Sequence, residues 1–554
     1  MYADFHCHPA AFAYDTRRLL PVEEINSSHP WAIPQSGHPN MTNTSPVQYS
    51  QSDLAKCVRS GTKLLFASLS PPEKGFFRGV KGTRVEKVFV QQLHDQWHEH
   101  GAQAATMWLV KQLKSVPGYS NLKPSDFGFL MGRFMNLKSE QVRKIQQGGY
   151  DYFEELKNEY QFFLRKAGQF TATSEEIQID KTGIKRKWWG SYHLVSHGHE
   201  VNVSTDRDEI IIIPTLGGIH SLGIGNPEDE DLRPGEPPRD INLDTLKSRI
   251  RQLKGEEPLQ DSMLPVWKHA PFYITFAQNF FNTLCGHTKS LPSRARLLFD
   301  QHKGQDLDIT HACIDIWREL LGLDQELRPN GSKRILIDIN HMSAAARFTY
   351  YKEIIKPFNK EYPLNLLPVI ASHAGYAGLD SLADMVQNAT KKKETDDFYV
   401  KGFLAWSINL CDQDVIEIFR SCGLLGISFD KRLLGTEPHA WLNGMNFGPL
   451  DRLRALRIFR RTLEQFVRIP FEYNLSEPLT IWDRICMGTG FDGAMQAMPR
   501  YSSVLQFSLF EQDLVDVLEN MKHEEPMWFG CYRPEELARK ICFENAYEFV
   551  RKHY

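Results

Sequence analysis

Short runs of apolar and β-branched residues recur along this chain, each followed by a loop that contains Gly, His or Asn, and then by a helical pattern. Eight such runs stand at residues 2–6, 63–69, 209–215, 272–276, 334–339, 367–372, 424–429 and 484–489. Strands that are apolar almost throughout are typical of a parallel sheet covered on both faces. Helical patterns follow several of the runs, at 343–358, 412–421, 451–467 and 511–521. Eight strand–helix units predict an α/β fold, a (β/α)8 TIM barrel, with an open doubly wound sheet as the alternative.

The length of 554 residues exceeds what a barrel of eight such units needs. Most of the surplus lies at 70–208, directly after the second predicted strand, where residues 85–114 and 139–166 have helical patterns. We interpret 70–208 as a large, mainly helical insertion that packs on a single barrel domain spanning 1–554. The acidic, proline-rich stretch from Glu228 to Arg239 predicts a solvated loop.

Charge and cysteine content limit the partners. The 65 basic and 68 acidic residues nearly cancel, so no global field favours nucleic acid or an anionic membrane surface. No run approaches the roughly 18 apolar residues of a membrane span, and the first residues lack a signal-peptide pattern. Nine scattered cysteines without a CxxC pair indicate a reducing compartment. We expect a cytoplasmic protein with a small-molecule substrate and no nucleic-acid or membrane partner; a homodimer stays open.

The end of the first predicted strand carries the first sign of chemistry. His6 and His8 are two residues apart, and the period of two in a strand sends both side chains to one face. In a barrel, the inward face at the carboxyl end of the strands forms the mouth of the active site. Two imidazoles that converge there suit a zinc-like cation, although a lone pair of this kind also occurs as two polar residues at a strand end.

Two further histidines stand at equivalent places. His341 follows the fifth predicted strand, and His373 ends the sixth. Four histidines at three strand ends are hard to explain by core packing, because each stands where an apolar run stops. The sequence therefore predicts a metal site, or the remains of one, formed by His6, His8, His341 and His373.

Seven segments in the same order resemble the membrane (renal) dipeptidase family of metal-dependent amidohydrolases. They are Asp4–Pro9, Leu216–Leu222, Tyr273–Asn279, Ile337–Ser343, Pro368–His373, Gly488–Gly493 and Ile541–Asn545. The resemblance covers nearly the whole chain, except that residues 70–208 match weakly. It implies a (β/α)8 barrel that holds divalent metal, usually two zinc ions, and hydrolyses dipeptides or similar small amides.

At four positions the chain departs from the family pattern. Leu216 stands where the family has its metal-bridging glutamate, and Gly490 stands where it has an aspartate taken as catalytic. Gln278 replaces a histidine that polarises the substrate, and Ile408 replaces the arginine that holds the dipeptide carboxylate. Without the bridging carboxylate, two dications would repel each other, so the departures favour one ion over two.

These observations lead to a hypothesis for the site. His6, His8 and His341 hold one divalent ion, most simply zinc, while His373 serves as a further ligand or orients the reacting group. Gln278 donates a hydrogen bond to the substrate, and Asp492 is the candidate base. The expected function is hydrolysis of a small amide or peptide-like substrate. A deaminase-like enzyme with one metal and an inactive barrel that binds ligands or acts as a scaffold are the alternatives.

Overall fold

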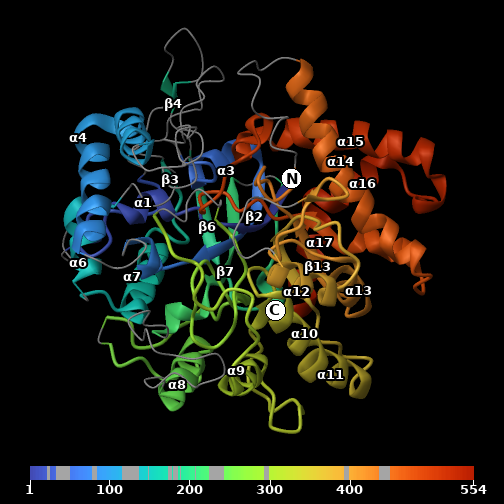
Figure 1. Ribbon diagram of the computed structural model, residues 1–554, viewed down its shortest axis with the longest axis horizontal. Helices are drawn as coiled ribbons and strands as arrows, with labels where there is room; N and C mark the ends of the chain where they lie inside the picture. Colours follow the sequence, from blue (N-terminus) through green and yellow to red (C-terminus); the bar gives the residue numbers. More distant parts are fainter. Residues whose placement is uncertain are drawn as a thin grey trace.

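Eight parallel strands form a nearly closed barrel surrounded by helices (Figure 1). In chain order the strands are β1 (Tyr2–Cys7), β2 (Thr62–Leu69), β7 (Glu209–Gly217), β8 (Tyr273–Thr275), β9 (Leu336–Asp338), β10 (Ile370–Ala374), β13 (Leu424–Ile427) and β14 (Ile485–Met487). Their order around the sheet is β1-β2-β7-β8-β9-β10-β13-β14. All eight coincide with the predicted runs, so the structure confirms the TIM barrel.

The computed structural model describes residues 1–20, 25–32, 50–77, 84–114, 137–147, 149–172, 177–178, 185–186, 189–205, 208–223, 242–261, 263–291, 298–391, 399–435 and 449–554. The predicted loop at 228–239 and parts of the stretch 70–208 lie outside these residues. Within them, no helix has the length and apolarity that crossing a membrane requires.

The first and last strands meet and close the barrel. The Asp4 carboxylate accepts hydrogen bonds from the backbone N–H of Thr489 at 2.9 Å and from its hydroxyl at 2.5 Å. Just beyond, the Gly490 N–H donates to the His6 carbonyl at 2.8 Å, and the His8 N–H donates to the Phe491 carbonyl at 2.9 Å. These contacts exclude the open doubly wound sheet, in which the first and last strands would not meet.

Two apolar layers explain why the strands are apolar on both faces. Along β7, Ile211 and Ile213 point into the barrel, whereas Ile210, Ile212 and Leu216 belong to the layer between sheet and helices. The C-terminal helix α17 (Asn545–His553) covers the amino-terminal end of the barrel, with the Phe549 ring 6.1 Å from that of Phe5. The opposite end is left for polar side chains.

The predicted helices that follow the strands are present. They are α10 (Ala344–Tyr350) with α11 (Lys356–Glu361), α13 (Asp412–Arg420), α14 (Pro449–Glu472) and α15 (Phe507–Glu524). The helix predicted at 343–358 is interrupted by a π-helical turn at Tyr351–Ile355. Pro357 stands two residues after this turn, and because proline has no N–H it cannot complete the α-helical ladder at this point.

The stretch 70–208 contributes helices and also strands, of which β3 (Thr171–Ala172), β4 (Ile177–Gln178) and β5 (Lys185–Arg186) are two residues long. Its helices are α4 (Arg84–Lys114), α6 (Ser139–Gln146) and α7 (Tyr152–Leu164), which gather on one side of the molecule in Figure 1. Its strand β6 (Trp189–Leu194) pairs in parallel with the first half of β7. No sequence pattern predicted that addition to the barrel sheet. The interpretation of 70–208 as an insertion stays a prediction.

A buried charge cluster fastens α7 to the segment after β1. The Arg18 guanidinium lies 2.6 Å from Asp15, 2.9 Å from Glu155 and 3.0 Å from Glu159. Three carboxylates thus share one cation in a site almost without solvent. Burial raises the pKa of Glu155 to about 7 from an ordinary 4.5, although the Arg18 charge acts in the opposite direction.

This raised pKa predicts how stability depends on pH. Between about pH 4.5 and 7, folded Glu155 keeps a proton that the unfolded chain loses, so its ionisation lowers stability as the pH rises through this window. The free energy of unfolding of Glu155→Gln, relative to that of the wild type, should therefore rise by on the order of 3 kcal/mol between about pH 5 and about pH 8. Denaturant unfolding of both proteins at the two pH values measures this change. A difference in stability between variant and wild type that is the same at both pH values would contradict the raised pKa.

Candidate metal centre

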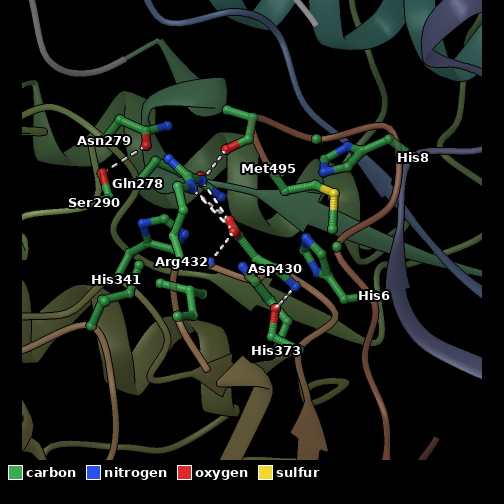
Figure 2. Close-up of a pocket in the computed structure, with 16 residues that line it drawn as sticks. His6, His8, Gln278, Asn279, Ser290, His341, His373, Asp430, Arg432 and Met495 are labelled. Atoms are coloured by element: carbon green, nitrogen blue, oxygen red, sulfur yellow. Dashed lines mark hydrogen bonds and ion pairs between the residues drawn. The ribbon is translucent and has the colours of Figure 1, made fainter. Parts of the chain in front are cut away.

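Four histidines from three strand ends line one pocket at the carboxyl end of the barrel (Figure 2). His6 belongs to β1 and His8 follows it, His341 lies in the loop after β9, and His373 belongs to β10. The His6 ring centre lies 5.2 Å from that of His8 and 4.1 Å from that of His373, and the His341 and His373 ring centres are 5.5 Å apart. The structure thus brings together all four predicted ligands.

Hydrogen bonds to Nδ1 set the tautomers of His8 and His6. The Nδ1 of His8 lies 3.2 Å from the Ser68 carbonyl oxygen, which can only accept, so this nitrogen carries the proton. The Nδ1 of His6 lies 3.2 Å from the Tyr273 hydroxyl, which donates its own proton to the Phe5 carbonyl and therefore accepts from the ring. In both rings Nε2 is left with the lone pair that a metal requires.

A serine and an aspartate orient His373. The Ser372 hydroxyl lies 2.7 Å from Nδ1 of His373 and 2.5 Å from the Asp338 carboxylate. Because the hydroxyl has a single proton, it donates to the carboxylate and accepts from the ring. His373 therefore also keeps the lone pair on Nε2.

In His341 the two ring nitrogens have the opposite roles. Its backbone lies in the left-handed region at φ 63°, and its buried Nδ1 has no hydrogen-bond partner among the described residues. The backbone of Gln278 bonds to the ring and favours its protonated form. A buried nitrogen without a partner is costly unless something occupies it, which makes Nδ1 of His341 a candidate donor to a metal.

Burial keeps three of the four rings neutral. Loss of water lowers the pKa of His6 and of His373 well below the ordinary value, with smaller contributions from neighbouring histidines. It lowers the pKa of His341 to about 3. Neutral imidazole is the form that coordinates a metal, so the site is prepared for one near neutral pH.

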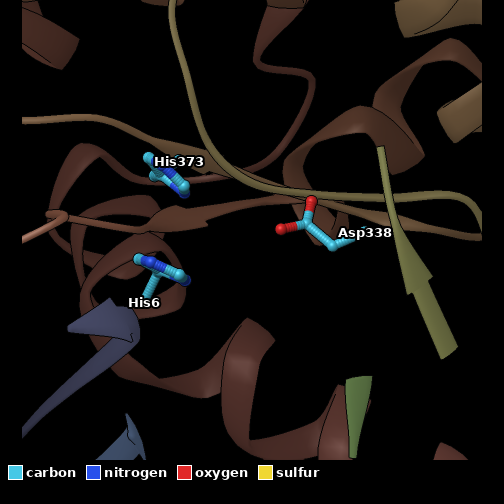
Figure 3. A group of neighbouring side chains, drawn as sticks. All are labelled: His6, Asp338 and His373. Atoms are coloured by element: carbon cyan, nitrogen blue, oxygen red, sulfur yellow. The ribbon is translucent and has the colours of Figure 1, made fainter. Parts of the chain in front are cut away.

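Asp338 is a residue of this site that the sequence analysis missed. It lies with His6 and His373 so that one possible ligand atom of each falls within 4.8 Å of the others (Figure 3). Its oxygens accept bonds from the Thr275 and Ser372 hydroxyls and from the N–H groups of Ser372 and Asn340. Burial raises its pKa to about 6. A carboxylate inside an otherwise apolar strand was the signal that could have identified it.

Two predicted catalytic residues have different positions. Gln278 lines the pocket as expected. Asp492 does not line it, because its carboxylate accepts bonds from the N–H groups of Gln51 and Ser52 at 2.6 and 2.8 Å and from the hydroxyls of Ser52 and Ser50 at 2.7 and 3.1 Å. Asp492 therefore fastens residues 50–52 to the barrel. This placement does not fit the predicted role as a base.

The residues at which the chain departs from the family pattern do not all line the pocket. Ile408 and Gly490 line the pocket, as the resemblance implies. Leu216 does not: it is fully buried in the apolar layer between sheet and helices, on the same face of β7 as Ile210 and Ile212. A carboxylate at 216 would point away from the histidines, so the correspondence with a metal-bridging glutamate fails in this structure.

The loop after β13 supplies the charged residues of the pocket that were missed. Asp430 and Arg432 both line it and form a two-pronged ion pair, with Nε 3.0 Å from each Asp430 oxygen (Figure 2). They directly follow the seventh predicted strand. The rule that pointed to the histidines, a polar side chain just beyond an apolar run, could have found them.

Neither a protein-family model nor a curated protein matches the sequence. Solved structures do match. A metallopeptidase from Rhodobacter sphaeroides, solved with a phosphinate mimic of the dipeptide L-Ala-D-Ala, is 12% identical over 100% of this chain and 99% of its own, with a TM-score of 0.42. PvdM from Pseudomonas aeruginosa, described as a probable dipeptidase, is 11% identical over 93% and 92%, with a TM-score of 0.38.

An amidohydrolase from Pseudomonas aeruginosa is 12% identical over 65% of this chain and 78% of its own, with a TM-score of 0.34. With TM-scores below 0.5, the function must be decided from the side chains of the site.

The positions of Gly490 and Leu216 predict opposite outcomes for an added carboxylate. A Cβ on Gly490 would meet only Cδ2 of His373, at 3.8 Å, and aspartate tolerates the left-handed backbone that Gly490 adopts at φ 75°. Gly490→Asp should therefore fold and bind metal more tightly. Leu216→Glu should lose about 2 kcal/mol or more of stability without any gain in metal, because its carboxylate would be buried unpaired.

Metal content after dialysis against a weak chelator, together with denaturant unfolding, checks both variants. Gly490→Asn is the control, because asparagine has the shape of aspartate without its charge. A well-folded Leu216→Glu protein that binds more metal would mean that residue 216 reaches the pocket after all.

Proposed function

We propose that this chain is a metal-dependent hydrolase of a small amide or peptide-like substrate. The observation that carries the proposal is the convergence of His6, His8, His341 and His373, each with one ring nitrogen that keeps its lone pair. Four imidazoles in one buried pocket are costly to assemble for packing alone. They match the nitrogen donors that zinc prefers.

The donors present fit one ion better than two. His6, His8 and His341 would hold it, with His373 adjacent. Among the described residues that line the pocket, Asp430 is the one carboxylate, and Arg432 already neutralises it. A zinc ion bound here would polarise a substrate carbonyl and make a bound water acidic.

The surrounding residues supply the remaining functions. The Gln278 amide can donate a hydrogen bond to the substrate carbonyl. Neutral His373 can accept a proton at Nε2, and the Asp338 carboxylate would stabilise the resulting cation through the Ser372 hydroxyl. This chain of groups takes over the role that the sequence analysis gave to Asp492. Ile408, Leu433 and Met495 form an apolar wall that excludes water and accepts an apolar part of the substrate.

Metal content tests the proposal directly. Protein purified without chelators should contain about one equivalent of divalent metal at most, and the His6→Ala/His8→Ala double variant should contain much less. His302→Ala, at an exposed position outside the pocket, is the matched control. Two equivalents in the wild type would contradict the one-ion proposal. No metal after zinc supplementation would favour the inactive barrel.

Ordinary dipeptides should be hydrolysed slowly. Gln278 cannot provide the positive charge of a protonated histidine, and loss of such a donor typically slows the reaction about a hundredfold or more. Ile408 also offers no donor for a carboxylate at that wall. A dipeptide panel with zinc, manganese and cobalt measures the rate, and Gln278→His should raise it. Rapid turnover by the wild type, abolished by His6→Ala, would restore a plain dipeptidase.

A further inference from the structure

A second pair of histidines two residues apart lies in the stretch 70–208, outside the pocket. His197 and His199 flank Gly198 at a short 3-10 turn (Gly198–Glu200) that follows strand β6. Both imidazoles are exposed, whereas the four histidines of the pocket are buried. We propose that His197 and His199 bind a divalent transition-metal ion, such as zinc or nickel, at the protein surface. This inference does not depend on the proposed hydrolase, because the two sites share no residue.

The rings of His197 and His199 have the separation of two ligands of one ion. Their centres lie 5.4 Å apart, and their planes differ by 30°. An ion held at about 2.1 Å from two imidazole nitrogens in tetrahedral geometry places the ring centres roughly 5 Å apart. His6 and His8, which the pocket brings together, have a similar separation of 5.2 Å. Small changes in side-chain torsion therefore suffice to direct one nitrogen of each exposed ring to a shared ion.

Backbone contacts hold the turn in place. The Glu200 N–H donates to the His197 carbonyl at 3.0 Å. The Val201 N–H donates to the Gly198 carbonyl at 3.1 Å. Gly198 lies against the end of α17, where an added Cβ would be 2.4 Å from the Arg551 carbonyl oxygen. Because the backbone is fixed in this way, binding an ion costs the two imidazoles little more than the freedom of their own side-chain torsions.

Glu200 places a negative charge beside the pair. Its Oε1 lies 3.9 Å from Nδ1 of His197, and its Oε2 accepts hydrogen bonds from the N–H groups of Ser196 at 2.6 Å and of His197 at 3.2 Å. These bonds keep the carboxylate at the turn, where its charge attracts a dication. We assign Glu200 this electrostatic role and the two imidazoles the role of ligands, with water at the remaining positions of the ion.

The position of the turn separates this site from the pocket. Ser196 donates to the Lys268 carbonyl at 2.7 Å and accepts from the Lys333 ammonium. These lysines precede strands β8 and β9, so the turn lies at the amino-terminal end of the barrel, opposite the pocket. An ion bound here contacts neither the buried histidines nor a substrate among them. Imidazole ligands favour zinc, nickel or copper over magnesium and calcium, which prefer oxygen.

Retention on immobilised Ni²⁺ tests the site in the full chain without an affinity tag. A resin-bound ion reaches exposed imidazoles but not the buried histidines of the pocket. The wild type should need a higher imidazole concentration for elution than the His197→Ala/His199→Ala double variant. His302→Ala removes one exposed histidine elsewhere, and it is the matched control that should elute with the wild type. Elution of the folded double variant together with the wild type would overturn the proposal.

Calorimetric titration with Zn²⁺ measures the affinity directly. The starting protein is the full-length His6→Ala/His8→Ala variant stripped of metal, so that any zinc still bound by the rest of the pocket is common to all the proteins compared. Adding His197→Ala or His199→Ala should weaken binding at the surface about tenfold or more, and Glu200→Gln should weaken it several-fold. Mg²⁺ should not bind there. Unchanged Zn²⁺ affinity in either folded histidine variant would overturn the proposal.

The two metal proposals fail in distinguishable ways. The one-ion pocket is contradicted if a second equivalent of metal persists in the His197→Ala/His199→Ala protein. The surface site is contradicted if that variant keeps the retention on Ni²⁺ or the Zn²⁺ affinity of its parent protein. The retention measurement needs no substitution in the pocket, so it decides even where the His6→Ala/His8→Ala variant is unstable.

Discussion

The contact between the first and last strands determines whether a site exists at all. Asp4 and Thr489 join β1 to β14, and the bonds beyond them place His6 and His8 beside the loop that contains Gly490 and Gly493. A Cβ at Gly493 would lie 3.3 Å from the His8 ring, so a small residue is needed where this loop passes. His6 and His8, at the start of the chain, meet His341 and His373 because this seam closes.

The same loss of water acts in opposite directions on acids and bases at the site. It lowers the pKa of His341 and raises the pKa of Asp338, so both groups are held nearer to neutrality than they would be in water. Tyr273, Thr275 and Ser372 form a polar layer above the apolar interior and hydrogen-bond to His6, Asp338 and His373. The tautomers of His6 and His373 follow from that layer, because the Tyr273 and Ser372 hydroxyls accept from Nδ1 and leave the lone pair on Nε2.

Sequence patterns predicted the strands and the four histidines because both depend on local alternation and on where apolar runs end. They failed where contacts between residues far apart in the sequence determine the structure. Asp492 adopts φ 62° and turns towards residues 50–52, which no local pattern announces. The position of Leu216 could have been predicted, since the period of two places it opposite Ile211 and Ile213. Strand β6 was missed because only its pairing with β7 defines it.

That pairing gives residues 70–208 a protective role. Strand β7 is nine residues long, but β8 pairs with it only at Leu216 and Gly217, near its end. Strand β6 covers the earlier part of the same edge, from Glu209 to Ile212. Without β6, that part of the edge would present unpaired N–H and C=O groups to any passing strand, a common origin of aggregation. Evolution could therefore shorten the helices of this stretch more readily than it could remove β6.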